Sequence, residues 1–327
     1  STWMCAALVT RSTPVSRKCW TAVAVLIALR SVSLAAALRV NGRDHCRSSP
    51  LIIAKSLKKT PSQYWLGVFV SVVFYFFSLP VVAAQPCAAK ANVEWAQIKK
   101  IVDGDTLHLR DGRKVRVMGI NTPEIGYRKT DKPNYPQPLA MAAKQTAEDF
   151  FAGDTKVGLS FGGQRVDHYG RVLANVYRAD GDSLSAHMLA LGLAWHVVVP
   201  PNEIDWRCLE KVEIAAKKQG AGLWSHKAYP TKQAKKLSLN DTGFQHITGK
   251  VISVNRSRGG WWLQLDQLAI RVQEKNLKYL DGVDPQDWLM QTLTIRGWVI
   301  DRSQSSAVKK KGYSALMMNL QHSAMLK

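Results

Sequence analysis

Apolar and polar residues alternate along the chain between residues 95 and 120. The segments TLHL (106–109) and KVRVMGI (114–120) both alternate with a period of two, which is typical of strands with one buried face. The Asp-Gly pair of the RDGR segment between them favours a tight hairpin. The pattern therefore predicts a β-meander over residues 95–120.

The next part of the chain mixes helical and strand periods. Residues 137–153 have helix formers at helical spacing and a closing glycine, and the segments 156–163 and 172–181 have the pattern of strands. Two further helices are predicted over 183–196 and 204–224. Three strands, a helix, two strands and two helices fit a mainly β (α+β) fold, a small barrel with attached helices.

A second pattern of strands occupies residues 244–327, after a polar and basic stretch at 227–243 that we expect to be a linker. Three alternating runs come first, a helix is expected to start at DPQDWLM (284–290), and a fourth strand follows at 292–299. The segment 315–320 is a candidate fifth strand. Strands with one helix between the third and the fourth predict a smaller oligonucleotide-binding (OB) barrel, although the two domains show no residue-level repeat. We expect this second domain to bind nucleic acid and to add affinity for it through its basic strands.

Residues 57–84 have the features of an export signal. Two lysines precede an uncharged apolar run of 18 residues, and Val82 and Ala84 are the small residues that a signal peptidase requires. We expect cleavage after Ala84 and export of the protein, which would be periplasmic or secreted. Because the run is almost long enough to span a bilayer, an uncleaved membrane anchor is the alternative. Residues 1–56 are expected to be an unstructured leader or sequence upstream of the true start.

Five cysteines occur in the sequence, and cleavage after Ala84 would retain only Cys87 and Cys208. In an exported protein these two are expected to form a disulfide bond, with two unpaired thiols as the alternative. The sequence has no CxxC motif and no Cys/His cluster, which argues against a structural zinc site.

The charge balance indicates a polyanionic partner. The sequence has 45 Lys and Arg against 24 Asp and Glu, a formal net charge of +21. Residues 1–84 contain ten of the basic residues and a single acidic one, Asp44, so residues 85–327 keep 35 basic and 23 acidic residues. The exported part is therefore basic in its own right, which favours nucleic acid, although a soluble basic protein has the same charge.

The segment VDGDTLHLRDGRKVRVMGINTPE (102–124) brings carboxylates and an arginine close together in sequence. Hydrolysis of a phosphodiester needs cations that face the phosphate and a carboxylate that deprotonates water. Four side chains have this chemistry: Asp105, Arg116, Glu124 and Arg171. Arg171 lies downstream of the segment, in DHYGR. Pro123 keeps Thr122 extended, so that a backbone carbonyl can be directed at a hard metal ion.

These motifs resemble those of the staphylococcal nuclease (thermonuclease) family. The resemblance covers about residues 94–226 and rests on VDGDT, VRVMGINTPE and DHYGR in this order, followed by GLAW and GLW. It implies an OB-type five-stranded barrel with three helices, and calcium-dependent cleavage of phosphodiesters in DNA and RNA.

The resemblance also implies a role for each matching residue. Asp105 corresponds to a carboxylate that binds Ca²⁺, and the backbone carbonyl of Thr122 to a further ligand. Glu124 corresponds to the general base that orients the attacking water. Arg116 and Arg171 correspond to two phosphate clamps, each able to donate two hydrogen bonds to one phosphate.

Other matching positions provide support or depart from the family pattern. Asp103 and Asp167 correspond to structural supports. Asn121 stands where the family has its second metal carboxylate, so it offers an oxygen ligand but no charge, and looser Ca²⁺ binding or a preference for another divalent ion is expected. The stretch WHVVVPPN (195–202) lacks the tyrosines that help to seat the terminal nucleotide in the family.

Three functions compete on this evidence. The leading hypothesis is an exported, metal-dependent nuclease that cleaves DNA and RNA with little sequence specificity, with no obligate protein partner. The alternative is a non-catalytic nucleic-acid-binding OB protein of the cell envelope, which Asn121 favours and the retained acids and arginines disfavour. The third is a structural envelope protein whose OB domain binds protein or glycan.

The adjacent Trp261 and Trp262 raise a separate question in the second domain. Tryptophans on a strand can stack on bases. Neighbouring strand residues point to opposite faces, however, so at least one of the two is expected to pack in the core.

Overall fold

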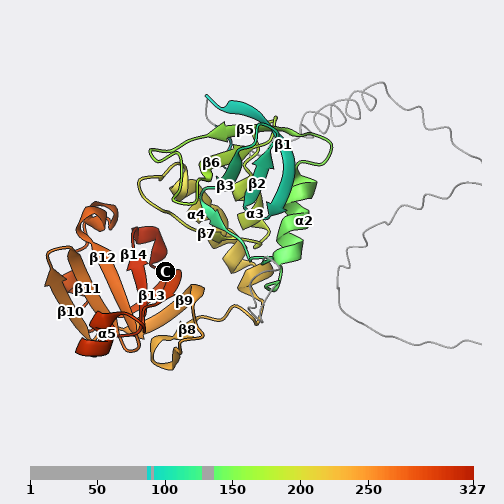
Figure 1. Ribbon diagram of the computed structural model, residues 1–327. Helices are drawn as coiled ribbons and strands as arrows, with labels where there is room; N and C mark the ends of the chain where they lie inside the picture. The colour runs from blue at the N-terminus through green and yellow to red at the C-terminus, as the bar shows by residue number, and fades with distance from the viewer. Residues whose placement is uncertain (1–86, 90–91, 127–135) are drawn as a thin grey trace, which may run out of the picture. The chain divides into compact units, whose positions relative to one another are not determined.

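The computed structural model describes residues 87–89, 92–126 and 136–327 (Figure 1). The predicted leader (1–56) and the predicted signal or anchor (57–84) lie outside the described residues. Along the described part of the chain, every helix is too short or too polar to cross a membrane.

The first barrel is closed by five strands, with the order β1-β2-β3-β6-β5. Their bounds are β1 Glu94–Asp103, β2 Thr106–Leu109, β3 Lys114–Val117, β5 Lys156–Ser160 and β6 Val172–Tyr177. β3 and β6 pair in parallel, and the other neighbours are antiparallel. This order, in which the third strand pairs with the fifth, is that of an OB barrel, so the predicted fold is confirmed.

Three helices accompany the barrel, as predicted: α2 (Ala140–Phe150), α3 (Leu184–Ala190) and α4 (Trp206–Lys218). α2 has small residues at Ala143 and Ala147, which are fully buried in the same core as the inward side chains of the strands. A short 3-10 turn, η1 (Gly222–Trp224), follows α4. α2 and α3 pack closely near the β1–β2 turn, and this turn carries the acids of the candidate site.

The second sheet has seven strands in the order β10-β11-β12-β14-β13-β9-β8. The bounds are β8 Lys232–Gln233, β9 Gly243–Lys250, β10 Ser253–Ser257, β11 Gly260–Leu265, β12 Leu268–Gln273, β13 Thr292–Asp301 and β14 Leu316–Leu320. Because β9 runs into β10 after two residues, the pair acts as one bent first strand, and β12 pairs in parallel with β14. The curled sheet therefore repeats the strand order of the first barrel.

The helix predicted to start at residue 284 is replaced by 3-10 turns. η3 (Glu274–Tyr279) and η4 (Pro285–Trp288) lie between β12 and β13, and the Asp284 side chain caps η4. The turn stops because Met290 has a positive φ of 66° and its amide donates to the carbonyl of Val251. The predicted start of the helix at residue 284 is confirmed, but tertiary pairing ends the helix after one turn.

Part of the predicted linker (227–243) belongs to the second sheet. β8 pairs in parallel with β9, and the 3-10 turn η2 (Ala234–Lys236) follows it. Ala234 and Leu237 are buried in the second core. Two further short helices were not predicted, α5 (Ser306–Lys311) and the 3-10 turn η5 (Ser323–Met325).

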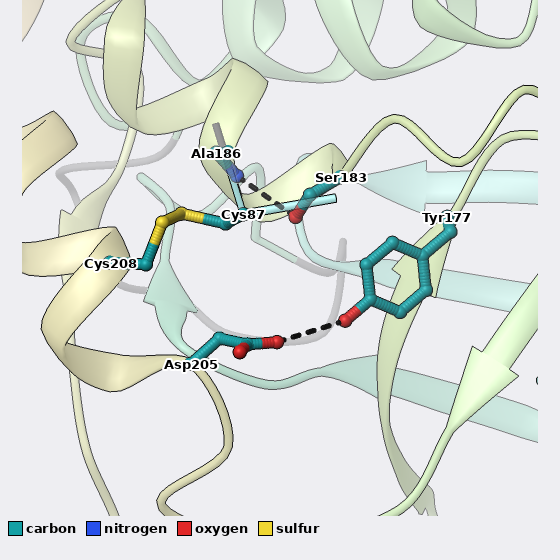
Figure 2. The surroundings of a disulfide bond; sticks show 6 residues. All are labelled: Cys87, Tyr177, Ser183, Ala186, Asp205 and Cys208. Carbon is teal, nitrogen blue, oxygen red and sulfur yellow. Dashed lines mark hydrogen bonds between the residues drawn. A yellow bond between two sulfur atoms is a disulfide. The ribbon is translucent and has the colours of Figure 1, made fainter. Parts of the chain in front are cut away.

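Cys87 and Cys208 form a disulfide bond, which decides between the two alternatives left by the sequence. The bridge joins the segment before β1 to the first turn of α4 across 121 residues (Figure 2). Nearby, the hydroxyl of Tyr177 donates to Asp205 at the start of α4, at 3.3 Å. The Ser183 hydroxyl accepts from the Ala186 amide and caps α3.

The two barrels are joined by a buried ion pair. Arg296 Nη1 of β13 lies 2.6 Å from Glu213 Oε1 of α4, and both side chains are at most 3% exposed. Glu213 Oε1 also accepts from the backbone amide of His196, at 2.7 Å. The Lys327 ammonium lies 3.1 Å from Glu210 Oε1 and 3.6 Å from Glu213 Oε2. The Glu213 carboxylate thus connects the two barrels.

The contact surface also contains His246, whose ring lies near Trp195 and Trp224. Burial is the main cause that lowers the pKa of His246, and together with nearby cations, first Arg296, it brings the pKa to about 3. An unfolded imidazole takes up a proton below pH 6.5, whereas the folded one stays neutral down to about pH 3. Since the unfolded state binds more protons in this window, the free energy of unfolding should fall as the pH falls through it.

We expect His246→Gln to reduce this pH dependence. The measurement is urea unfolding of both forms at neutral and at mildly acidic pH. His168→Gln, which replaces an exposed histidine, is the matched control and should leave the dependence as it is. An identical slope in the wild type and His246→Gln would contradict the expectation.

Candidate active site

The turn between β1 and β2 places two acids beside the helices. Asp103 and Asp105 flank Gly104, and the amide of Asp105 donates to Asp103 Oδ1 at 3.1 Å. A Cβ atom on Gly104 would lie 2.7 Å from Thr122 Cγ2 and 3.0 Å from the Cβ atom of Ala143. Glycine is therefore required for the turn to approach the Thr122 segment and α2 so closely.

Asp105 is buried and fully engaged by hydrogen bonds. Its Oδ2 atom accepts from the Thr122 amide at 2.7 Å and from the Thr122 hydroxyl at 3.0 Å. Its Oδ1 atom accepts from the Thr106 hydroxyl at 3.2 Å. These contacts fix the carboxylate between the β1–β2 turn and the chain that leaves β4 (Ile120–Asn121).

Arg116 lies on the outer side of β3, because the alternation of the strand directs Val115 and Val117 into the core. Its Nη1 atom lies 3.1 Å from Asp105 Oδ2 and donates to the carbonyls of Val117 and Ile120 at 2.8 and 3.0 Å. Arg116 therefore holds the turn between β3 and β4 as well as facing the acid.

Asn121 is positioned by a two-stranded sheet of β4 and β7 (Trp195–His196). It pairs with Trp195, and the amide of Val197 donates to the carbonyl of Gly119 at 3.0 Å. The side-chain oxygen of Asn121 accepts from Arg116 Nη2 at 3.1 Å. The β4 strand thus carries Asn121 to the same guanidinium that faces Asp105.

Glu124 is exposed at the surface, and its main chain is fixed. Its amide donates to Gln137 Oε1 at 2.8 Å, and its carbonyl accepts from the Gln137 amide at 3.0 Å. The surrounding protein raises the pKa of Glu124 by desolvation, and the charge of Asp105 raises it further, whereas Arg116 and Arg171 lower it. Both arginines therefore lie within electrostatic range of this carboxylate.

Arg171 is held by the DHYGR turn that precedes β6. Its Nε atom donates to Asp167 Oδ2 at 2.8 Å, and Asp167 Oδ1 accepts the amides of Arg171 and Tyr169 at 2.9 Å each. The guanidinium lies over the Tyr169 ring, 5.4 Å from its centroid. This contact uses Nε, and the terminal nitrogens of a guanidinium can also donate hydrogen bonds to a phosphate.

Asp103 differs from the other acids. Burial first, and then the neighbouring charge of Asp105, raise its pKa to about 7. It accepts the Asp105 amide, so it supports the turn in the way that the sequence predicted for it.

The oxygens around Arg116 test whether a metal fits this site. Asp105 Oδ2 and Asn121 Oδ1 both lie 3.1 Å from nitrogens of its guanidinium, so they converge on one positive group. Hard oxygens that converge in this way are the donors that Ca²⁺ prefers. Within residues 87–89, 92–126 and 136–327, however, no cluster of three or more His, Cys, Asp or Glu is arranged for a metal ion. The donors thus fit a hard cation in kind, with one carboxylate instead of two.

Two groups of predicted site residues emerge. Hydrogen bonds or ion pairs connect the first group directly: Asp105, Arg116, Asn121 and Thr122. Glu124 and Arg171 are related to this group through electrostatics. Two residues of the site were not predicted, Thr106 and Gln137. The place of Thr106 beside Asp105 in the DGDT motif was a usable signal, whereas Gln137 is 13 residues from Glu124 and no signal in the sequence connects the two.

Known proteins resemble this chain over the first barrel. Residues 114–226 match the family described as staphylococcal nuclease homologue. An uncharacterised endonuclease of Escherichia coli is 30% identical over 158 residues, which cover 48% of this chain and 89% of that protein.

Two Bacillus subtilis proteins also match. Endonuclease YncB is 37% identical over 145 residues, 42% of this chain and 64% of that protein. Endonuclease YhcR is 26% identical over 155 residues, 45% of this chain but only 13% of that protein. With a barrel of the expected strand order and a match to nearly the full length of the Escherichia coli protein, the chain belongs to the family of staphylococcal nuclease homologues.

Proposed function

We propose that this protein is an exported, metal-dependent nuclease that hydrolyses phosphodiester bonds of DNA and RNA with little sequence specificity. The observation that carries the proposal is one exposed carboxylate, Glu124, within electrostatic range of two arginines, Arg116 and Arg171. Family membership supports the nuclease part of the proposal. The disulfide bond supports export, because such bonds persist in oxidising compartments.

In the proposed reaction, Glu124 accepts a proton from a water molecule whose oxygen attacks the phosphorus. The new P–O bond forms as the bond to the leaving oxygen breaks, and the leaving oxygen is protonated from solvent. Arg116 and Arg171 bind the phosphate oxygens, on which negative charge increases in the transition state.

The divalent cation would be held by three ligands, the carboxylate of Asp105, the side-chain oxygen of Asn121 and the carbonyl of Thr122. When bound, such an ion supplies positive charge to the phosphate oxygens. Arg116 contacts two of these groups itself, so cation binding and the release of Arg116 toward a phosphate are expected to occur together.

The competing function is nucleic-acid binding without catalysis, which the neutral Asn121 favours. Residues 85–327 incubated with labelled plasmid and single-stranded DNA, with divalent ions titrated in, separate the two functions. We expect acid-soluble nucleotides that depend on the ion and disappear with a chelator. Intact polymer at every ion concentration, together with salt-sensitive DNA binding, would instead establish the binding protein.

Asn121→Asp is expected to tighten divalent-ion binding, on the order of tenfold, because ligand charge sets the affinity of oxygen sites for Ca²⁺. Calorimetric titration of the wild type and the variant measures the change. Asn255→Asp adds the same charge to an exposed position of the second sheet and is the control. Equal affinity in wild type and Asn121→Asp would mean that this side chain is not a ligand.

A further inference from the structure

The first barrel covers one part of the outer surface of the second sheet. On β9 and β13, outward side chains contact the first barrel: Phe244 lies 5.2 Å from Trp195 between ring centroids, and Arg296 pairs with Glu213. The outward side chains of β10, β11, β12 and β14 form another part. We refer to this part as the β11 face.

Strand alternation settles which tryptophan belongs to the core. Trp261 is buried with Leu263 and Leu265, on the inner side of β11. Trp262 is only half-buried and lies on the opposite side, together with Gln264. The expectation that one of the two packs in the core is therefore confirmed for Trp261, and Trp262 is the aromatic side chain of the β11 face.

Two arginines lie against Trp262. Arg271 is its direct cross-strand partner on β12, and its guanidinium carbon lies 5.5 Å from the ring centroid. The guanidinium carbon of Arg302, from the end of β13, lies 5.0 Å from the same ring. An aromatic side chain flanked by guanidinium groups offers a stacking surface for a base and donors for its phosphates.

The remaining outward positions of this face are uncharged. Asn255, Trp262, Arg271 and Asn319 form one row across the four strands, by the register of their pairs. The outward positions on either side of this row are Ser, Gly, Gln, Ala and Met, so the described β11 face has no carboxylate to repel a phosphate.

Two of the loops that border the face add further positive charge, whereas the β11–β12 turn contains the exposed Asp266. The β10–β11 turn contains Arg258, which is exposed. The β13–β14 connection has exposed lysines in the last turn of α5, at residues 309–311, and contains no acid from residue 302 to residue 315. Within this connection, Arg302 Nε donates to the Ser314 carbonyl at 2.9 Å. The connection is held against β11 by Gln264, which donates to the Ser314 hydroxyl.

We infer that the β11 face binds a single-stranded segment of nucleic acid. A base stacks on Trp262 after one guanidinium moves aside, and Arg271, Arg302 and the loop lysines bind the flanking phosphates. A duplex is a poorer ligand, because its bases are already stacked on each other. The inference rests on the proposed function, and it assigns to the second barrel the task of retaining a strand for cleavage by the first.

Binding is tested in the full chain carrying Glu124→Gln, so that the probe is not hydrolysed. Fluorescence anisotropy of labelled oligodeoxythymidine gives the dissociation constant for each variant. Trp262→Ala should weaken binding by about 5- to 100-fold, the range for loss of one stacked base. Arg271→Ala should also weaken binding. It should reduce the magnitude of the slope of log K against log salt concentration by about 0.7, which is the contribution of one phosphate of a single strand.

Arg207→Ala is the matched control, because Arg207 is exposed and lies over the Trp206 ring at 4.9 Å in the first barrel. It removes the same charge from the same kind of contact, and we expect a clearly smaller effect. Equal losses in Arg207→Ala and Arg271→Ala would overturn the inference, since net charge alone would then explain binding. Equally tight, Trp262-dependent binding of heparin would overturn it as well. Trp262→Phe, which keeps a ring, should retain most of the affinity if Trp262→Ala acts through stacking.

Failure of this inference is distinguishable from failure of the proposed function. With Glu124 intact, Trp262→Ala should raise KM for a long single strand while cleavage of a dinucleotide stays unchanged, because a dinucleotide is too short to need the second barrel. Unaltered strand affinity in Trp262→Ala, with cleavage retained, would overturn only the inference. If strand binding depends on Trp262 but the wild-type chain does not cleave the strand, only the nuclease proposal is overturned.

Discussion

Glu124→Gln is expected to lower the rate of phosphodiester cleavage by about 10²- to 10⁴-fold, the usual contribution of a general base. Glutamine keeps the shape of the side chain but does not accept the proton of the attacking water. The hydrogen bonds that fix this residue to Gln137 involve only its backbone, so the fold should be unchanged. Steady-state cleavage of a labelled single strand at saturating divalent ion measures the effect.

The specificity of this result is judged with Glu148→Gln. Glu148 lies on α2 and forms an i,i+4 ion pair with Lys144 at 3.6 Å, so its replacement removes one carboxylate from the same barrel without touching the site. Its activity should match the wild type, and the melting temperatures of all three forms should agree. A Glu124→Gln variant with wild-type turnover would remove Glu124 from the mechanism.

Arg116 is less suited to such a test. Besides facing Asp105, it donates to two carbonyls of the β3–β4 turn, so its truncation would disturb the turn together with the phosphate contact. Arg116→Lys, which keeps the charge, is the more informative change. Among the acids of the described residues, Arg171 forms its ion pair with Asp167, so it lends itself to direct replacement.

Arg296→Ala is expected to lower the free energy of unfolding by up to about 3–5 kcal/mol, because it leaves the buried Glu213 carboxylate with only the more distant Lys327 ammonium, 3.6 Å from its Oε2 atom. Urea unfolding monitored by tryptophan fluorescence gives the change. Arg256→Ala, which breaks the exposed pair with Glu274, is the control and should cost at most about 1 kcal/mol.

A second variant tests the cause of this loss. If an unpaired buried charge is responsible, Glu213→Gln in the Arg296→Ala background should recover part of the stability, because it removes that charge. Additive losses in the double variant would show that packing, and not charge, dominates at this position.

The sequence predicted the first barrel well because its signals are local. The hairpin at Asp111-Gly112, the period-two strands and the three helices are each encoded within a few residues, and the family motifs fixed their order. The site residues could be named for the same reason, since Asp105, Arg116 and Asn121 lie in one short segment that folds on itself.

The features that the sequence did not indicate depend on distant partners. The 3-10 turn at Pro285–Trp288 ends because Met290 pairs with Val251, and the stretch 232–237 is ordered by β9 and not by its own polar composition. The ion pair of Glu213 with Arg296 joins residues 83 positions apart, and neither carries a local signal of burial.

The bridge between Cys87 and Cys208 has a consequence for the cell that makes this protein. A copy kept in the reducing cytosol retains two thiols and lacks the covalent closure of a loop of 121 residues, and long loops are those whose closure stabilises a fold most. A cell that keeps this chain reduced is therefore expected to hold a less stable protein than one in which the bridge has formed.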